Sequence, residues 1–233
     1  MRIGSSIILL NGYCFQSYQW KFLRPLGSLH NVLKFLDQYN VDEICIIRPV
    51  RKEDSYLSFI NDLNQIQSSL SNSPISLGGG IRLIRHINLL KDLPIERLHL
   101  SNVFLEKNMQ VINKISNLYG KQALVATLPI KCVENDLLVY HGARRAFVPL
   151  KVSTLDLINE YADELMIIDV ENEGSNESFN FKILDNLKFQ NNRLIISGGI
   201  GPTTIMKAKE IGLASCIIDN RVLHNENYIK TEL

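Results

Sequence analysis

The sequence lacks a marked excess of charge of either sign. Its 233 residues include 25 Lys and Arg against 24 Asp and Glu. Proteins that bind nucleic acid or anionic lipid through charge carry a clear basic excess or a clustered basic patch. The balanced charge therefore argues against nucleic acid and membrane as partners, and it favours a small molecule or another protein.

Cysteine pairs and long apolar runs are also missing. The four cysteines, Cys14, Cys45, Cys132 and Cys216, lie far apart and mostly within apolar runs, with none of the spacings that mark zinc sites. We expect buried, reduced thiols, no metal and no cofactor. The apolar run near the N-terminus is only a few residues long, too short for a signal-peptide core or a membrane span. These features predict a soluble, cytoplasmic protein.

What the sequence does contain is a regular alternation of two patterns. Short β-branched runs predict strands at 5–10, 43–47, 74–77, 97–100, 123–128, 164–170, 193–197 and 215–219. Apolar residues three or four apart predict helices at 28–39, 55–70, 83–93, 104–119, 153–164, 180–187 and 202–212. The segments after the first and fifth strands, which carry Trp20 and His141, are expected to be loops.

Near-continuous apolar strands followed by amphipathic helices indicate a parallel sheet with helices on its outer face. Eight such strands predict a closed (β/α)₈ barrel, the TIM barrel, with residues 1–233 as its single domain. An open, doubly wound sheet is the alternative. The chain also looks duplicated: "VDEICII" (41–47) resembles "ADELMII" (162–168), and "SLGGGIR" (76–82) resembles "ISGGIGP" (196–202). Four βα units in each half predict two half-barrel repeats.

Two glycine turns are the first candidate sites. A glycine that opens a helix lets the backbone approach a phosphate closely, because no Cβ intervenes. The first predicted phosphate site contains Gly79, Gly80, Ser101 and Asn102, and the second contains Gly198, Gly199 and Asn220. Asp219 is an unfavourable neighbour for a phosphate in the second. Each turn could also be a tight strand-to-helix connection that binds nothing.

Four motifs together carry a family resemblance. "SLGGGIR", "HGAR" (141–144), "ENEGS" (171–175) and "ISGGIG" resemble the cyclase subunit of imidazole glycerol phosphate synthase, and the similarity runs from Arg2 to about Asn220. It implies a (β/α)₈ barrel that binds a substrate with two phosphates, receives ammonia through the barrel from a glutaminase partner, and forms the imidazole ring of histidine biosynthesis. It also adds Gly174 to the second predicted phosphate site.

The same resemblance reveals missing catalytic groups. The family reaction needs a carboxylate at the C-terminal ends of the first and fifth strands, because ring closure requires proton transfers at opposite ends of the substrate. The family pattern places Ile8 and Pro129 at these two positions, and neither can transfer a proton. Gln16 and Arg48 stand where a lysine and a further aspartate are expected. Whether the chain is an enzyme stays open, with Asp169 as the remaining carboxylate candidate.

At the opposite end, the resemblance implies a gate. The family has a ring of four alternating charges that faces the glutaminase and forms the entrance for ammonia. Arg2, Glu43, Arg97 and Glu164 match those positions with charge sign kept at all four, each at the start of a predicted strand. Solvated charges at strand ends are the alternative interpretation.

The chain combines the family's gate charges with replacement of its catalytic carboxylates. This combination resembles a second branch of the family, which is associated with surface-polysaccharide gene clusters. Its strand-1 aspartate is likewise replaced by an apolar residue, in a segment similar to "IILLNGYCFQ". The resemblance implies a barrel that pairs with a glutaminase and delivers ammonia to a sugar amidotransferase making an acetamidino-type group. Two alternatives remain: a histidine-pathway cyclase, which is a lyase, with rearranged catalytic groups, and a barrel that only senses a phosphorylated metabolite.

Overall fold

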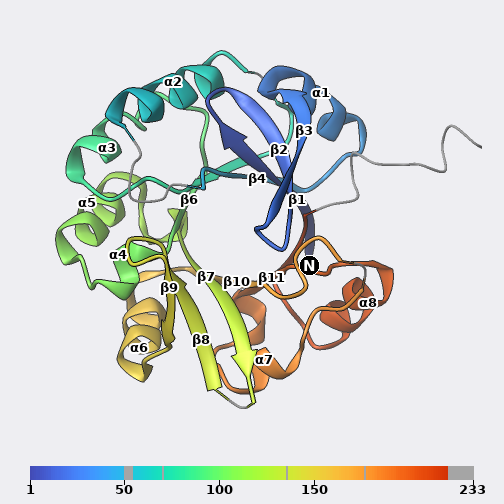
Figure 1. Cartoon of the computed structure of the whole chain (residues 1–233). Coiled ribbons are helices and arrows are strands. Elements are labelled where there is room, and N and C mark those ends of the chain that lie inside the picture. Colours follow the sequence, from blue (N-terminus) through green and yellow to red (C-terminus); the bar gives the residue numbers. More distant parts are fainter. Residues whose placement is uncertain (50–54, 70, 135, 176, 220–233) are drawn as a thin grey trace, which may run out of the picture.

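The computed structural model describes residues 1–49, 55–69, 71–134, 136–175 and 177–219. Eight parallel strands close into a barrel with helices around it (Figure 1). They are β1 (Arg2–Leu10), β4 (Glu43–Ile47), β5 (Ile75–Gly78), β6 (Arg97–Leu100), β7 (Leu124–Val133), β10 (Glu164–Asp169), β11 (Leu194–Ser197) and β12 (Ser215–Ile218). Pairing of β10 with β7 closes the ring. The predicted (β/α)₈ barrel is confirmed, and the open sheet was the wrong alternative.

The helices follow the predicted order with shorter bounds. They are α1 (Leu29–Gln38), α2 (Tyr56–Gln67), α3 (Ile84–Asn88), α4 (Asn102–Leu105), α5 (Met109–Tyr119), α6 (Val152–Tyr161), α7 (Lys182–Asp185) and α8 (Pro202–Glu210). Short 3₁₀ turns precede β7 and β11, at Lys121–Ala123 and Asn191–Arg193. The single helix predicted over 104–119 is wrong: Lys107 has a positive φ, and the Asn108 side chain caps a new helix by accepting the Val111 N–H.

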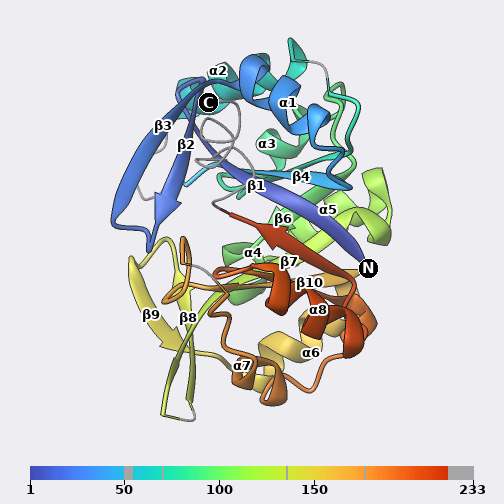
Figure 2. The same ribbon diagram turned by 90° about the vertical axis from the view of Figure 1, so that its right-hand side faces the viewer.

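Two antiparallel hairpins replace the predicted loops. Strands β2 (Tyr13–Tyr18) and β3 (Phe22–Ser28) follow β1, whereas β8 (Asp136–His141) and β9 (Ala146–Pro149) follow β7. Asn11 and Gly12 form the two-residue turn after β1, both with positive φ, which is the Asn-Gly hairpin signal that the prediction overlooked. Figure 2 shows both hairpins at the end of the barrel away from the N-terminus.

Side chains that alternate along each strand divide the interior into two parts. The larger part lies between the barrel and its helices, and its fully buried members include Leu36, Phe59 and Phe104. The smaller part fills the barrel lumen and consists of Cys45, Val125, Met166, Ile195 and Ile217. The lumen is therefore packed with side chains, as is usual for this fold.

Across the described ranges, no helix has the length and apolar character needed to cross a bilayer.

Candidate functional site

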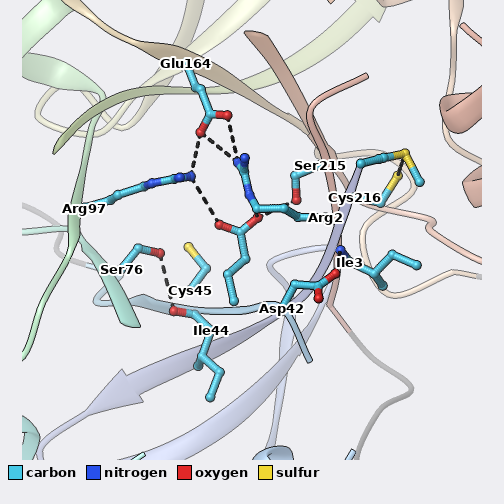
Figure 3. A network of polar contacts seen from close by, with 12 residues as sticks. Arg2, Ile3, Asp42, Ile44, Cys45, Ser76, Arg97, Glu164, Ser215 and Cys216 are labelled. Carbon is cyan, nitrogen blue, oxygen red and sulfur yellow. Dashed lines mark hydrogen bonds and ion pairs between the residues drawn. The ribbon is translucent and has the colours of Figure 1, made fainter. Parts of the chain in front are cut away.

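Four charged side chains close the N-terminal end of the barrel. Arg2, Glu43, Arg97 and Glu164 stand at the first residues of β1, β4, β6 and β10, so parallel pairing brings them to one edge. Arg2 lies 3.1 Å from Glu43 and 2.8 Å from Glu164. Arg97 lies 2.7 Å from Glu164 and 3.5 Å from Glu43. Each arginine bridges both glutamates, and the side chains point toward one another (Figure 3).

The charge ring is partly sheltered from water. The two glutamate side chains are only 8% and 9% exposed, and the arginines 31% and 27%. Burial alone would lower the pKa of Arg2, but hydrogen bonds and charge attraction from Glu164 and Glu43 raise it above its usual value. The Ser215 hydroxyl also donates to Glu43. Such buried charges are tolerated because each is paired and hydrogen-bonded.

Above the ring, polar side chains meet inside the lumen. The His99 ring contacts Thr127 Oγ1 at 2.9 Å through Nδ1, and it contacts Ser76 Oγ at 3.0 Å and Cys45 Sγ at 3.5 Å through Nε2. Burial lowers the pKa of His99 to about 4, so the imidazole is neutral at pH 7. Sequence analysis placed His99 in a strand but missed this lumen cluster, because strand register decides which side chains face inward.

A cavity of about 540 Å³ opens at the C-terminal end, within the size range of small-molecule sites. Its floor includes His99, Thr127 and Met166, and its walls include both Ile8 and Pro129. These two residues therefore face the cavity at the strand ends where the family pattern puts carboxylates. Neither side chain can donate or accept a proton.

The first glycine turn borders this cavity. A Cβ on Gly79 would lie 1.7 Å from the Arg48 carbonyl oxygen, so close strand packing explains that glycine by itself. Gly80, Ser101 and Asn102 all line the cavity. Ser101 Oγ and Asn102 Nδ2 are buried and find no hydrogen-bond partner among the described residues, while Asn102 Oδ1 accepts the Gly142 N–H at 3.0 Å. Unsatisfied buried donors are costly, and a ligand would relieve that cost.

The second glycine turn is built differently. A Cβ on Gly198 would lie 2.3 Å from the Asp169 carbonyl oxygen, and one on Gly199 would lie 2.9 Å from Ser178 Oγ. The Gly174 N–H donates to the Asp219 carboxylate at 3.0 Å. Asn220 lies outside the described residues. Gly174 thus contacts an acidic side chain, whereas Gly198 and Gly199 pack against the Asp169 backbone and Ser178.

Asp169, the carboxylate candidate, ends β10 and is 1% exposed. Its Oδ2 accepts two hydrogen bonds, one from Asn172 Nδ2 at 2.7 Å and one from the Asn180 N–H at 2.9 Å. It is absent from the described residues that line the cavity. These contacts hold the segment after β10 in place.

The two hairpins meet over the cavity. The rings of Trp20 and Tyr140 pack edge to face with centroids 5.1 Å apart. Glu173 accepts hydrogen bonds from the Trp20 N–H at 3.2 Å and the Ser17 hydroxyl at 3.3 Å. Burial raises the pKa of Glu173, and these hydrogen bonds partly oppose that rise. The prediction that His141 lies in a loop is wrong, because His141 is the last residue of β8. Its Nε2 is 3.5 Å from Glu106.

Within the ranges that the structure describes, no three His, Cys, Asp or Glu side chains gather as a metal site would require. The buried thiols of Cys14, Cys45 and Cys216 have pKa values raised to about 12, mainly by burial, so they are protonated at neutral pH.

A family model and several known proteins are similar to this chain. The family model described as "Histidine biosynthesis protein" matches residues 4–228. A Campylobacter jejuni protein named "Putative imidazole glycerol phosphate synthase subunit hisF2" is 27% identical over 100% of this chain and 94% of its own length. A Prochlorococcus marinus protein of the same name is 26% identical over 78% of this chain and 71% of its own. The HisF subunit of Dictyoglomus thermophilum is 22% identical over 91% and 84% respectively.

Proposed function

The chain belongs to the histidine biosynthesis protein family as a HisF-like barrel, and on that premise we propose that it is the barrel subunit of a glutamine amidotransferase complex. In this role a glutaminase docks on the N-terminal face, and ammonia passes through the lumen toward the C-terminal cavity. A sugar amidotransferase that builds an acetamidino-type group for surface-polysaccharide biosynthesis then uses the ammonia.

The charge ring is the observation that carries this proposal. Four ionic side chains from strands of both halves of the barrel meet at its N-terminal end, where Arg2 and Arg97 each bridge Glu43 and Glu164. A stability role alone does not require charges there, because well-packed apolar residues often serve as well as a buried ion pair. Bonds shared among four residues can instead rearrange when a partner docks.

The lumen supports the same role. Polar atoms lie between the charge ring and the cavity, on Cys45, Ser76, His99 and Thr127. A neutral imidazole offers hydrogen bonds to ammonia without adding positive charge to the lumen. Because the pKa of the His99 imidazolium is about 4, this side chain is a poor proton donor to ammonia at neutral pH.

The residues that line the cavity favour delivery of ammonia over closure of an imidazole ring. Ile8 and Pro129 occupy the two wall positions at which the family resemblance expects proton-transferring groups. A substrate bound there would meet hydrocarbon at both reacting ends. The phosphate sites stay predictions: Gly79, Gly80, Ser101 and Asn102 on one side, and Gly174, Gly198, Gly199 and Asn220 on the other.

Arg97→Gln tests the gate. This change removes one positive charge but leaves Arg2 bonded to both glutamates, so the barrel is expected to fold. We expect the wild-type barrel to stimulate glutamine hydrolysis by its cognate glutaminase, and the variant to lose about tenfold of that stimulation, within the usual range of coupling between sites. Initial rates of glutamate formation measure the effect.

Lys151→Gln is the matched control, because Lys151 precedes α6 away from the charge ring and its loss should leave stimulation intact. Absence of complex formation with the wild-type barrel, or equal stimulation by both barrels, would rule out the gate.

The histidine-pathway cyclase is the second candidate, favoured by the imidazole glycerol phosphate synthase names of the relatives. Asp169 is then the available carboxylate, although its Oδ2 already accepts hydrogen bonds from Asn172 and Asn180. Expression in a strain that lacks the cyclase decides between the two functions. Growth without histidine, lost in Asp169→Asn, would support the cyclase, whereas no growth at good expression would favour the ammonia-conducting barrel.

A further inference from the structure

The two sides of the C-terminal cavity are chemically unequal. We infer that the cavity takes a ligand with a single phosphate, held beside Gly80, Ser101 and Asn102, and that Asp219 closes the opposite side to a second phosphate. The family resemblance implies a ligand with two phosphates, so this inference assigns the protein a different ligand class. It concerns the cavity alone and stands whether or not ammonia passes through the lumen.

The accepting side offers donors that the protein leaves unused. Ser101 Oγ and Asn102 Nδ2 are buried with no partner among the described residues, and both residues line the cavity. Both atoms can donate a hydrogen bond, and an anionic oxygen is the acceptor that would gain most from them. Arg48 and Arg82 also line the cavity, and the charge of Arg48 is offset by its buried ion pair with Asp62 at 2.8 Å.

The opposite side is already filled by the protein's own carboxylate. Asp219 lines the cavity and accepts the Gly174 N–H at 3.0 Å, the backbone donor expected to hold a second phosphate. Glu173 also lines the cavity and is only 6% exposed. Two acidic groups would repel a phosphate there, and the donor it needs is taken.

The second glycine turn is likewise covered by the chain itself. The N–H groups of Ser178 and Phe179 both donate to the Gly199 carbonyl oxygen, at 3.0 and 3.3 Å. Gly198 and Gly199 are absent from the described residues that line the cavity. Their lack of a Cβ serves packing against Asp169 and Ser178, so these glycines need no ligand to explain them.

The electrostatics of Asp219 agree with this geometry. Burial, with smaller contributions from Glu173 and Asp169, raises its pKa to about 7, although the Gly174 hydrogen bond lowers it. The site is thus already unfavourable for one negative charge, and a phosphate would add more. A sugar monophosphate has the required form, with a phosphate for one side and hydroxyl groups for the other.

Amide NMR with inorganic phosphate as the probe tests the inference at pH 8, where Asp219 is mostly ionised. The Gly80 and Gly174 amide resonances report the two sides separately. In the wild-type protein we expect saturable shifts at Gly80 and none at Gly174. Asp219→Ala removes both the charge and the oxygen that accepts the Gly174 N–H, and it should make Gly174 respond to phosphate while Gly80 still does.

Asn102→Asp is the matched opposite change, placing a carboxylate on the accepting side. It should weaken the Gly80 response at least tenfold, and a dispersed amide spectrum verifies that each variant is folded. Saturable shifts at both glycines in the wild-type protein would overturn the inference, as would no shift at Gly80 or an unchanged Gly174 in Asp219→Ala. These titrations contain no glutaminase, so their failure is distinct from failure of the ammonia proposal.

Discussion

Individual buried side chains give the two ends of this barrel different chemistry. Burial keeps the His99 imidazole neutral inside the lumen at pH 7. It also raises the pKa of Asp219 beside the cavity to about 7, so this carboxyl group is only partly ionised at that pH. Burial disfavours the charged form of either group, which lowers the pKa of a histidine and raises that of an aspartate. At the charge ring, by contrast, opposite charges are paired, because Arg2 and Arg97 each face both Glu43 and Glu164.

Asp219 should make stability depend on pH. Its pKa in the folded protein is about 7, above the ordinary value of 3.8. The stabilising effect of the protonated form is complete below the unfolded pKa and is lost as pH rises through about 7. We expect the midpoint of thermal unfolding to fall between pH 5.5 and 8.5, and to fall less in Asp219→Asn. Equal pH slopes for the two proteins would contradict this.

At the scale of elements, the duplication is clearer in the structure than in the sequence. The first strand of each half, β1 or β7, continues into an antiparallel hairpin, β2–β3 or β8–β9. Each half also has a glycine that packs against the backbone at the end of the preceding strand, Gly79 on Arg48 and Gly198 on Asp169. The repeated turn is therefore a packing device first, and its use for a ligand differs between the halves.

Gly198→Ala and Gly212→Ala separate packing from backbone strain. Both glycines have a positive φ, 93° and 78°, so alanine is strained at either position. A Cβ at Gly212 meets nothing within 4 Å, whereas one at Gly198 lies 2.3 Å from a carbonyl oxygen. We expect Gly212→Ala to cost about 1 kcal/mol of unfolding free energy and Gly198→Ala at least about 2 kcal/mol more. Chemical denaturation measures both, and equal costs would contradict the packing argument.

For the whole molecule, the charge ring joins strands from both halves of the barrel at one end. The two glutamates are nearly buried, and each has two arginine partners. Removing one arginine leaves both glutamates paired, while removing both leaves two buried negative charges facing each other. The ring is therefore expected to behave as a cooperative unit.

Arg2→Gln, Arg97→Gln and the double variant test this. Each single change should cost about 1 kcal/mol of unfolding free energy, and the double change about 3 kcal/mol or more, because uncompensated buried charges are strongly destabilising. Denaturation of the wild-type protein and the three variants gives the coupling directly. Additive costs would show that the four charges act as separate surface pairs.

The sequence by itself determined the barrel, because eight β-branched runs alternate with seven amphipathic helical patterns and each pattern follows from local periodicity. The glycine turns could be found as local strand-to-helix features, whereas the four charges were singled out by the resemblance to the family. Sequence analysis missed the two hairpins, although Asn11 and Gly12 carry the turn signal for the first.

Only the tertiary structure decided what the glycine turns face. Asp219 and Gly174 are 45 residues apart in the chain, and Asn102 and Gly142 are 40 apart, so no local pattern reports their neighbours. Strand register and barrel closure bring Asp219 to the Gly174 N–H, and they leave Ser101 Oγ and Asn102 Nδ2 without a partner among the residues that the structure describes. Two turns that read alike in the sequence thereby acquire different environments, since hydrogen bonding and burial depend on contacts between distant segments.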